Sequence, residues 1–137
     1  MSRNPVKKKM LVFHSAYTFD HLKEFGMEIF VQARDAGNFF DEILTVSPVA
    51  NLQYASDDNR NYTKPEFFRL DSKNVILEGK ITRFRLLKKF PALNFAFAQI
   101  SLVLTILRHG DLRHVKVVRA EDPRVNGLYG FFFSRIL

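Results

Sequence analysis

Cysteine and tryptophan are both absent from this chain of 137 residues. Without cysteine, the chain can form no disulfide, carries no thiolate nucleophile and cannot build a zinc site on sulfur ligands. A secretory signal peptide is not expected either, because the basic start MSRNPVKKK leads into an apolar run of only residues 10–13. A reducing compartment fits this composition, and we expect a cytoplasmic protein.

Glycine is scarce, with six residues in the chain, and none lies in HSAYTFD, the stretch that follows the first predicted strand. The dinucleotide fingerprint and the ATP-binding phosphate loop both require glycines there, so both are absent. The chain also lacks the HExxH pattern of zinc hydrolases and the GxSxG elbow of serine hydrolases. The sequence therefore assigns no catalytic residue, and its four histidines are equally compatible with structural roles: His14, His21, His109 and His114.

A long hydrophobic run is also missing. The uncharged stretch Ala92–Leu107 falls short of the roughly 20 residues that a helix needs to cross a bilayer. Asn94, Ser101 and Thr105 share one stripe of the predicted helix. We expect a helix that is buried against a sheet rather than inserted in a membrane.

The remaining pattern alternates short apolar strands with amphipathic helices. Residues 21–36 have apolar positions at helical spacing, with Asp20 as the predicted N-cap and Gly37 as the stop. Such alternation predicts an α/β fold: a three-layer, Rossmann-like domain over residues 10–137, with a mostly parallel sheet and helices on both faces, after a basic tail at residues 1–9. The predicted strands are Met10–Phe13, Ile43–Val46, Phe67–Leu70, Val75–Ile81 and Val115–Arg119, and further helices are predicted at Ala92–Leu107 and Leu128–Leu137.

Ligands of open parallel sheets bind outside the carboxyl ends of the strands, where the loops meet. This rule selects a set of candidate substrate-binding residues: Ser15, Tyr17, Thr18, Arg83, Glu121 and Asp122. Two alternatives remain open. Ser15, Thr18 and Asp20 could simply cap the first helix, and Asp122 could cap the last helix ahead of Pro123. Since Glu121 and Asp122 are adjacent, we expect their side chains to diverge rather than to form an acid and base pair.

The formal net charge of +7 is unevenly distributed along the chain. A block without any acid carries Lys80, Arg83, Arg85, Lys88 and Lys89, interleaved with Phe84 and Phe90. Arg85, Lys88 and Lys89 are the candidate contacts to an anionic surface, such as a phosphate group or a membrane. A solvated linker is the alternative interpretation.

Three stretches resemble the N-terminal half of GT-B glycosyltransferases of the family 4 kind: FVQARDAGNFFDEILTVSPVA, LEGK and VVRAEDPRVNGLYGFFFSRIL. The resemblance runs through most of the chain from Met10 onward. It departs from the family in two loops. Many members have glycines where this chain has Ser15-Ala16-Tyr17, and a histidine where it has Ala120-Glu121-Asp122.

The resemblance implies a retaining transfer of a hexose from a nucleotide sugar to a glycan or lipid-phosphate acceptor, without an obligatory metal or other cofactor. In such enzymes two Rossmann-like domains enclose the active site, and the second domain holds most of the donor site. The N-terminal domain usually supplies acceptor contacts. The sequence is therefore expected to be an incomplete, acceptor-side half that is inactive alone, with a role in polysaccharide synthesis at the inner face of the membrane.

The competing hypothesis is a non-enzymatic Rossmann-like or flavodoxin-like binding module that holds an anionic partner, a membrane surface or nucleic acid. The loops lack the base-stacking aromatic patterns of RNA-binding domains, which argues against nucleic acid. The apolar C-terminal helix, with FFF at its centre, also predicts self-association through bare apolar surface.

Overall fold

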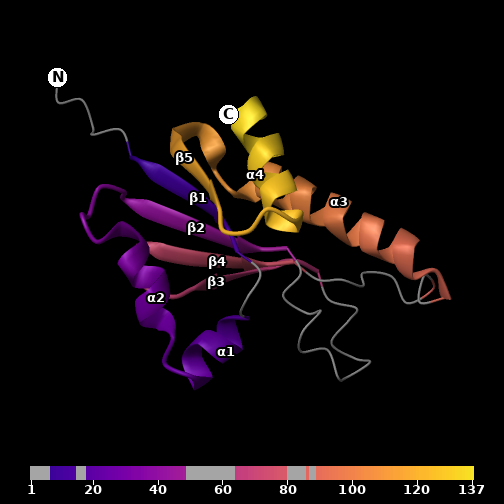
Figure 1. Cartoon of the computed structure of the whole chain (residues 1–137), viewed down its shortest axis with the longest axis horizontal. Coiled ribbons are helices and arrows are strands. Elements are labelled where there is room, and N and C mark those ends of the chain that lie inside the picture. The colour runs from indigo at the N-terminus through magenta and orange to yellow at the C-terminus, as the bar shows by residue number, and fades with distance from the viewer. Residues whose placement is uncertain (1–6, 15–17, 49–63, 80–85, 87–88) are drawn as a thin grey trace.

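The computed structural model describes residues 7–14, 18–48, 64–79, 86 and 89–137 (Figure 1). It is an α/β protein with one five-stranded sheet, in the order β3-β4-β2-β1-β5. β3 is antiparallel to β4, whereas all other neighbouring strands are parallel. The strands are β1 (Lys9–Phe13), β2 (Glu42–Ser47), β3 (Glu66–Arg69), β4 (Asn74–Glu78) and β5 (Val115–Ala120). The predicted mostly parallel sheet and the predicted hairpin are confirmed.

One face of the sheet packs against two long helices, α3 (Pro91–His109) and α4 (Val125–Ile136). Alternate side chains of β1 and β2 point to this face, because strand side chains alternate with a period of two. They form the main core with residues of both helices: Leu11, Phe13, Leu44, Val46, Leu102, Ile106 and Phe133 are among its buried members. The central strands are buried on both faces, which explains their almost continuous apolar sequences.

The opposite face of the sheet carries smaller clusters, and Figure 1 shows α1 (Phe19–Glu24) and α2 (Glu28–Gln32) on that side. Leu22 of α1 and Val31 of α2 pack with Ile76 of β4. Met10 and Val12 of β1 pack with Ile43 of β2 in a separate cluster. Figure 1 shows that α1 and α2 lie below the sheet, away from α3 and α4.

The helix predicted over residues 21–36 is wrong as a single element. It is broken into α1, α2 and a short 3-10 turn, η1 (Ala33–Asp35), and Gly26 lies between α1 and α2 with a left-handed φ of 61°. Glycine adopts that conformation without steric cost. The N-cap is Thr18, whose hydroxyl accepts a hydrogen bond from the His21 amide, and not the predicted Asp20, which lies in the first turn.

The break at Gly26 also changes which side chains are buried. Helical spacing predicted an apolar stripe that includes Phe25, Ile29 and Phe30, but these side chains are 62%, 65% and 65% exposed. Leu22 and Val31 are the buried residues of the two short helices. Two short helices at an angle cannot present the single stripe that one continuous helix would present.

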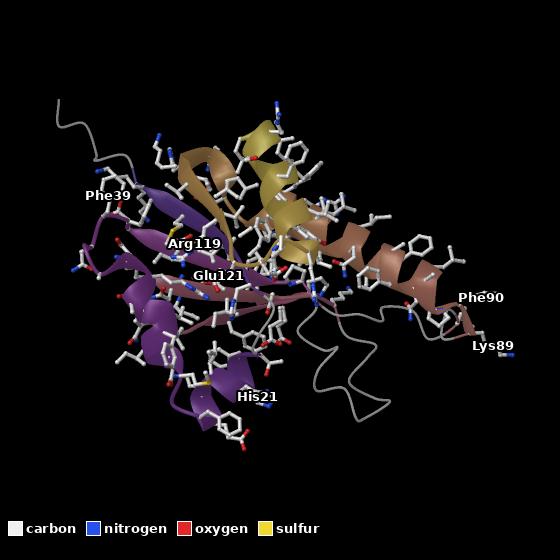
Figure 2. The ribbon with its side chains drawn as sticks, viewed as in Figure 1. His21, Phe39, Lys89, Phe90, Arg119 and Glu121 are labelled. Atoms are coloured by element: carbon white, nitrogen blue, oxygen red, sulfur yellow. The ribbon has the colours of Figure 1, made fainter. Side chains whose placement is uncertain are left out.

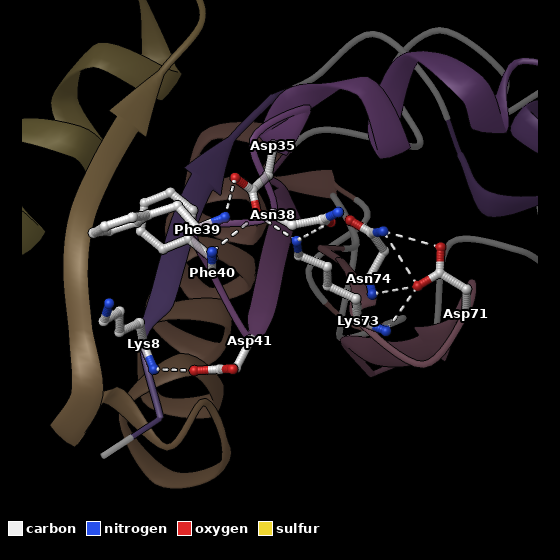
Figure 3. A network of polar contacts seen from close by, with 9 residues as sticks. All are labelled: Lys8, Asp35, Asn38, Phe39, Phe40, Asp41, Asp71, Lys73 and Asn74. Atoms are coloured by element: carbon white, nitrogen blue, oxygen red, sulfur yellow. Dashed lines mark hydrogen bonds and ion pairs between the residues drawn. The ribbon is translucent and has the colours of Figure 1, made fainter. Parts of the chain in front are cut away.

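A polar network fixes the β3–β4 hairpin to the turn after α2 (Figure 3). The Asp35 carboxylate accepts hydrogen bonds from the amides of Phe39 and Phe40, at 2.9 Å each, and pairs with the Lys73 ammonium. Asp71 in turn accepts hydrogen bonds from the Asn74 amide at 2.7 Å and from its side chain. The Lys73 ammonium, with the two backbone donors, holds the pKa of Asp35 below its ordinary value.

Lys9 lies at the boundary between the predicted basic tail and the fold. It is the first residue of β1 and is only 5% exposed. Its ammonium pairs with Glu42 at 3.0 Å and with Asp111 at 2.8 Å. At the amino-terminal ends of the strands, Lys9 therefore links β1 to β2 and to the segment after α3.

Candidate functional site

The carboxyl ends of four parallel strands form one edge of the sheet. His14 follows β1, Ser47 and Glu78 are the last residues of β2 and β4, and Glu121 follows β5. The ladder continues into the loops, because the Glu121 amide donates to the Phe13 carbonyl at 3.1 Å. The loops after β1 and β5 therefore begin side by side, whereas the predicted third loop, with Arg83, lies outside the described residues.

The direction of strand addition reverses between β1 and β5. From β1 the chain adds β2 and β4 on one side, and then returns through α3 to add β5 on the other side. In open α/β sheets the crevice at such a reversal is where ligands bind. His14 and Glu121 follow the two strands that flank this reversal.

A cluster of ionisable side chains occupies this position. The Glu121 carboxylate is paired with His14 Nδ1 and with Arg34, whose Nε and Nη2 atoms lie 3.0 and 3.3 Å from the two carboxylate oxygens. Arg119 approaches the same carboxylate at 3.8 Å. Figure 2 shows Arg119 and Glu121 near the centre of the molecule, where β5 runs into α4. We call His14, Arg34, Arg119 and Glu121 the switch-point cluster.

Arg34 is held in place from both of its sides. It belongs to η1, its side chain is only 7% exposed, and its Nη1 atom donates to the Thr45 hydroxyl of β2 at 2.9 Å. The other edge of the guanidinium makes the two contacts with Glu121. Arginine suits this role because its planar group can bind a carboxylate through two parallel hydrogen bonds. The result is a carboxylate in a fixed orientation beside the end of β1.

Burial lowers the pKa of His14 below its ordinary value of 6.5. The Glu121 charge opposes this effect, and the Arg34 charge adds to it. Since Arg34 neutralises much of the charge of Glu121, desolvation of the imidazole prevails. His14 is therefore neutral near pH 7, with Glu121 contacting Nδ1. A neutral imidazole beside a carboxylate is a polar pair of the kind that matches hydroxyl groups.

A second carboxylate, that of Glu78, lies at the carboxyl end of β4. Glu78 is 4% exposed, and its carboxylate accepts a hydrogen bond from the Phe19 amide at the start of α1. The chain thus places its own carboxylate at this helix end, where the partial positive charge of the helix terminus favours a negative group.

Thr18 caps α1, which was one of the two structural alternatives, whereas Asp122 does not cap α4: the N-cap residue of α4 is Arg124, and no side chain caps this helix. The Thr18 hydroxyl caps α1 and also contacts the His21 ring at 2.9 Å. Asp122 accepts hydrogen bonds from the Arg124 amide at 2.9 Å and from the buried Asn126 side chain, and so fixes the turn before α4. Glu121 and Asp122 diverge as predicted, one toward the switch-point cluster and the other toward α4.

The other predicted site residues fall into two groups. Ser15, Tyr17, Arg83, Arg85 and Lys88 lie outside the described residues. Lys89 is described, and Figure 2 shows it with Phe90 at the outer end of α3, well away from Glu121 and Arg119. The switch-point cluster and the described part of the basic block are therefore separate features.

Sequence reasoning missed Arg34 and Arg119 and gave His14 no specific role. Arg34 lies in a predicted helix and is 87 residues from Glu121, so no local pattern relates them. Arg119 is the penultimate residue of β5, and its position beside Glu121 could have been predicted from the strand assignment alone. His14 could have been found from its place directly after a buried strand, which is where ligand contacts collect in this class of fold.

Within the described ranges, no group of three or more histidine, aspartate or glutamate side chains could hold a metal ion. Comparison of the chain with protein-family models finds no match. Comparison with curated proteins and with solved structures likewise finds no match. The geometry at the reversal of strand order is thus the feature from which a function can be argued.

Proposed function

We propose that the chain is the acceptor-side, N-terminal domain of a GT-B glycosyltransferase. In this proposal the fold is a three-layer Rossmann-like domain, and the complete enzyme transfers a hexose, with retention, from a nucleotide sugar to a glycan or lipid-phosphate acceptor. The switch-point cluster binds hydroxyl groups of the acceptor. The nucleotide sugar is bound mainly by a second domain across the cleft.

One observation supports the proposal above all others: polar side chains gather at the reversal between β1 and β5. When the antiparallel β3 is set aside, the third parallel strand lies beside the second, the second beside the first and the first beside the fourth. This is the arrangement in the first half of Rossmann folds, and ligands bind at its reversal. The resemblance in VVRAEDPRVNGLYGFFFSRIL covers the same β5–α4 unit that carries Glu121.

The chemistry of the cluster suits a sugar better than a phosphate. Arg34 is already paired with Glu121, so its charge is largely neutralised inside the protein. Sugar hydroxyls both donate and accept hydrogen bonds, and they match a carboxylate beside a neutral imidazole. In this proposal Glu121 and His14 orient the acceptor, while Arg34 and Arg119 hold the Glu121 carboxylate in place.

Saccharide binding by the full chain tests this proposal. We expect free hexoses and disaccharides to shift the amide NMR signals of His14 and Glu121, and we expect Glu121→Gln to weaken binding about tenfold, because one charged hydrogen-bond acceptor is lost. UDP-glucose is the donor probe, and it should bind weakly because the second domain would supply most of its contacts.

Arg113→Gln is the matched control, since the Arg113 side chain is 85% exposed beyond the opposite edge of the sheet. This variant should bind saccharides as the wild type does. The proposal fails if no saccharide in the panel shifts the signals of the cluster. It also fails if Glu121→Gln and Arg113→Gln have equal effects on saccharide affinity.

A further inference from the structure

The exposed side of α3 is apolar, whereas a helix that covers a sheet in a soluble protein usually exposes its polar side. Asn94 and Ser101 are 4% and 5% exposed and lie on its inner side, together with Leu102 and Ile106. The outer side is apolar, with five side chains that are each at least 41% exposed: Leu93, Phe97, Ile100, Leu104 and Leu107. The polar stripe that the sequence revealed is thus the buried stripe, and a hydrophobic stripe faces outward.

The outer side of α4 continues this surface. Leu128 and Phe131 are 71% and 62% exposed, and Phe132 is 45% exposed. Between the two helices lies a groove of about 420 Å³, lined by Ile100 and Leu104 of α3 and by Leu128 and Phe132 of α4, among others. The two exposed stripes therefore form one continuous surface, which we call the α3–α4 apolar face. A contiguous exposed patch of this kind marks an interaction site.

The charges that border this face are all positive on the two helices. Neither α3 nor α4 contains an aspartate or glutamate. Arg108 lies in the last turn of α3, and the guanidinium of Arg135 in α4 lies 5.3 Å from the centre of the Phe131 ring. Lys89 precedes α3 at its outer end (Figure 2), next in sequence to the rest of the basic block.

We propose that the α3–α4 apolar face docks on an anionic membrane surface. The apolar side chains would enter the boundary between headgroups and acyl chains, and Lys89, Arg108 and Arg135 would meet the acidic headgroups. Apolar area combined with flanking basic residues is what holds interfacial helices on membranes. The docking does not depend on the transferase activity, and it would apply equally to a domain with another function.

Two other uses of this face fit the observations less well. A second copy of the chain carries the same net charge of +7 and would bring Arg108 and Arg135 close to like charges. Insertion of α3 across the bilayer is compatible with its length, because α3 is the one helix among the described residues that is long and apolar enough to span a membrane. However, Leu102 and Ile106 of α3 are fully buried in the sheet core, and spanning would remove them from it.

Vesicle flotation of the full chain tests the proposal. Vesicles of phosphatidylcholine with phosphatidylglycerol should retain the chain, whereas vesicles of phosphatidylcholine alone should not, and high salt should weaken the retention. The double substitution Phe97→Ser and Ile100→Ser should lower the partition coefficient at least about tenfold. Arg108→Gln with Arg135→Gln should lower it by about tenfold or more on the acidic vesicles.

The α2 helix supplies a matched control. Ile29 and Phe30 are each 65% exposed on the opposite side of the sheet, so Ile29→Ser with Phe30→Ser removes similar apolar area and should leave vesicle binding unchanged. Circular dichroism should show that every variant is folded. Equal loss from both apolar pairs, or equal retention by both kinds of vesicle, would overturn the proposal. A dimer that Phe97→Ser and Ile100→Ser dissociate, without vesicle binding, would overturn it in favour of self-association.

Discussion

Replacing Phe133 with alanine should lower the free energy of unfolding by about 3–5 kcal/mol, the range for loss of a fully buried aromatic side chain. Phe133 is completely buried, and its ring centre lies 5.4 Å from that of Phe13 in β1. It also packs with Tyr129 one turn earlier in α4. These three rings attach α4 to the sheet, and truncation of one of them leaves a cavity in a close-packed core.

Chemical denaturation followed by circular dichroism measures this change, and Phe131→Ala is the control. Phe131 is two residues away in the same helix but is 62% exposed, so its truncation should change stability by no more than about 0.5 kcal/mol. If the two alanine variants were equally stable, α4 could not be docked on the sheet through Phe133. The turn that carries Glu121 and Asp122 would then lose its support.

Replacing Arg34 with methionine should cost about 1–3 kcal/mol of stability, because it leaves the Glu121 carboxylate without its strongest partner. This cost is lower than for a fully buried ion pair, since the Glu121 side chain is 21% exposed and water can screen part of its charge. Methionine preserves much of the apolar stem of arginine, so the change isolates the loss of the guanidinium.

A double-mutant cycle separates this pairing from other effects of the substitution. Arg34→Met and Glu121→Gln should each destabilise the protein, and the two together should cost less than the sum of their separate costs, with a coupling energy of about 1 kcal/mol. Arg34→Lys should be intermediate, because lysine keeps the charge but cannot make the two parallel contacts. Strictly additive costs would contradict the contact between Arg34 and Glu121.

Strand positions were the most predictable part of the fold. Buried strands such as MLVF are apolar on both faces, and the turn residues at 71–74 mark the hairpin, so each predicted strand overlaps an observed one. The break at Gly26 was not predictable from periodicity, because apolar residues recur at helical spacing on both sides of it. For α3 the helix was predicted, but periodicity cannot say which stripe faces the sheet, and here the polar stripe does.

The candidate site was only partly predictable. Glu121 was chosen because it follows a strand at the carboxyl edge, and that reasoning depends on fold class alone. Arg34 reaches Glu121 only because η1 brings it over Thr45 of β2, which is a consequence of the three-dimensional path after Gly26. Thr18 and Asp122 were chosen by the same rule as Glu121, but the Thr18 hydroxyl caps α1 and the Asp122 carboxylate binds the Arg124 amide in the turn before α4.

The most direct test of the switch-point cluster is the titration of His14 by NMR, with its signal assigned from a His14→Gln variant. We expect its pKa to lie below the ordinary value of 6.5, because burial disfavours the charged imidazole. Glu121→Gln should lower this pKa further by removing an attractive charge, and Arg34→Met should raise it by removing a repulsive one. A His14 signal that titrates at the ordinary value and responds to neither substitution would contradict the convergence of these three residues at the edge of the sheet.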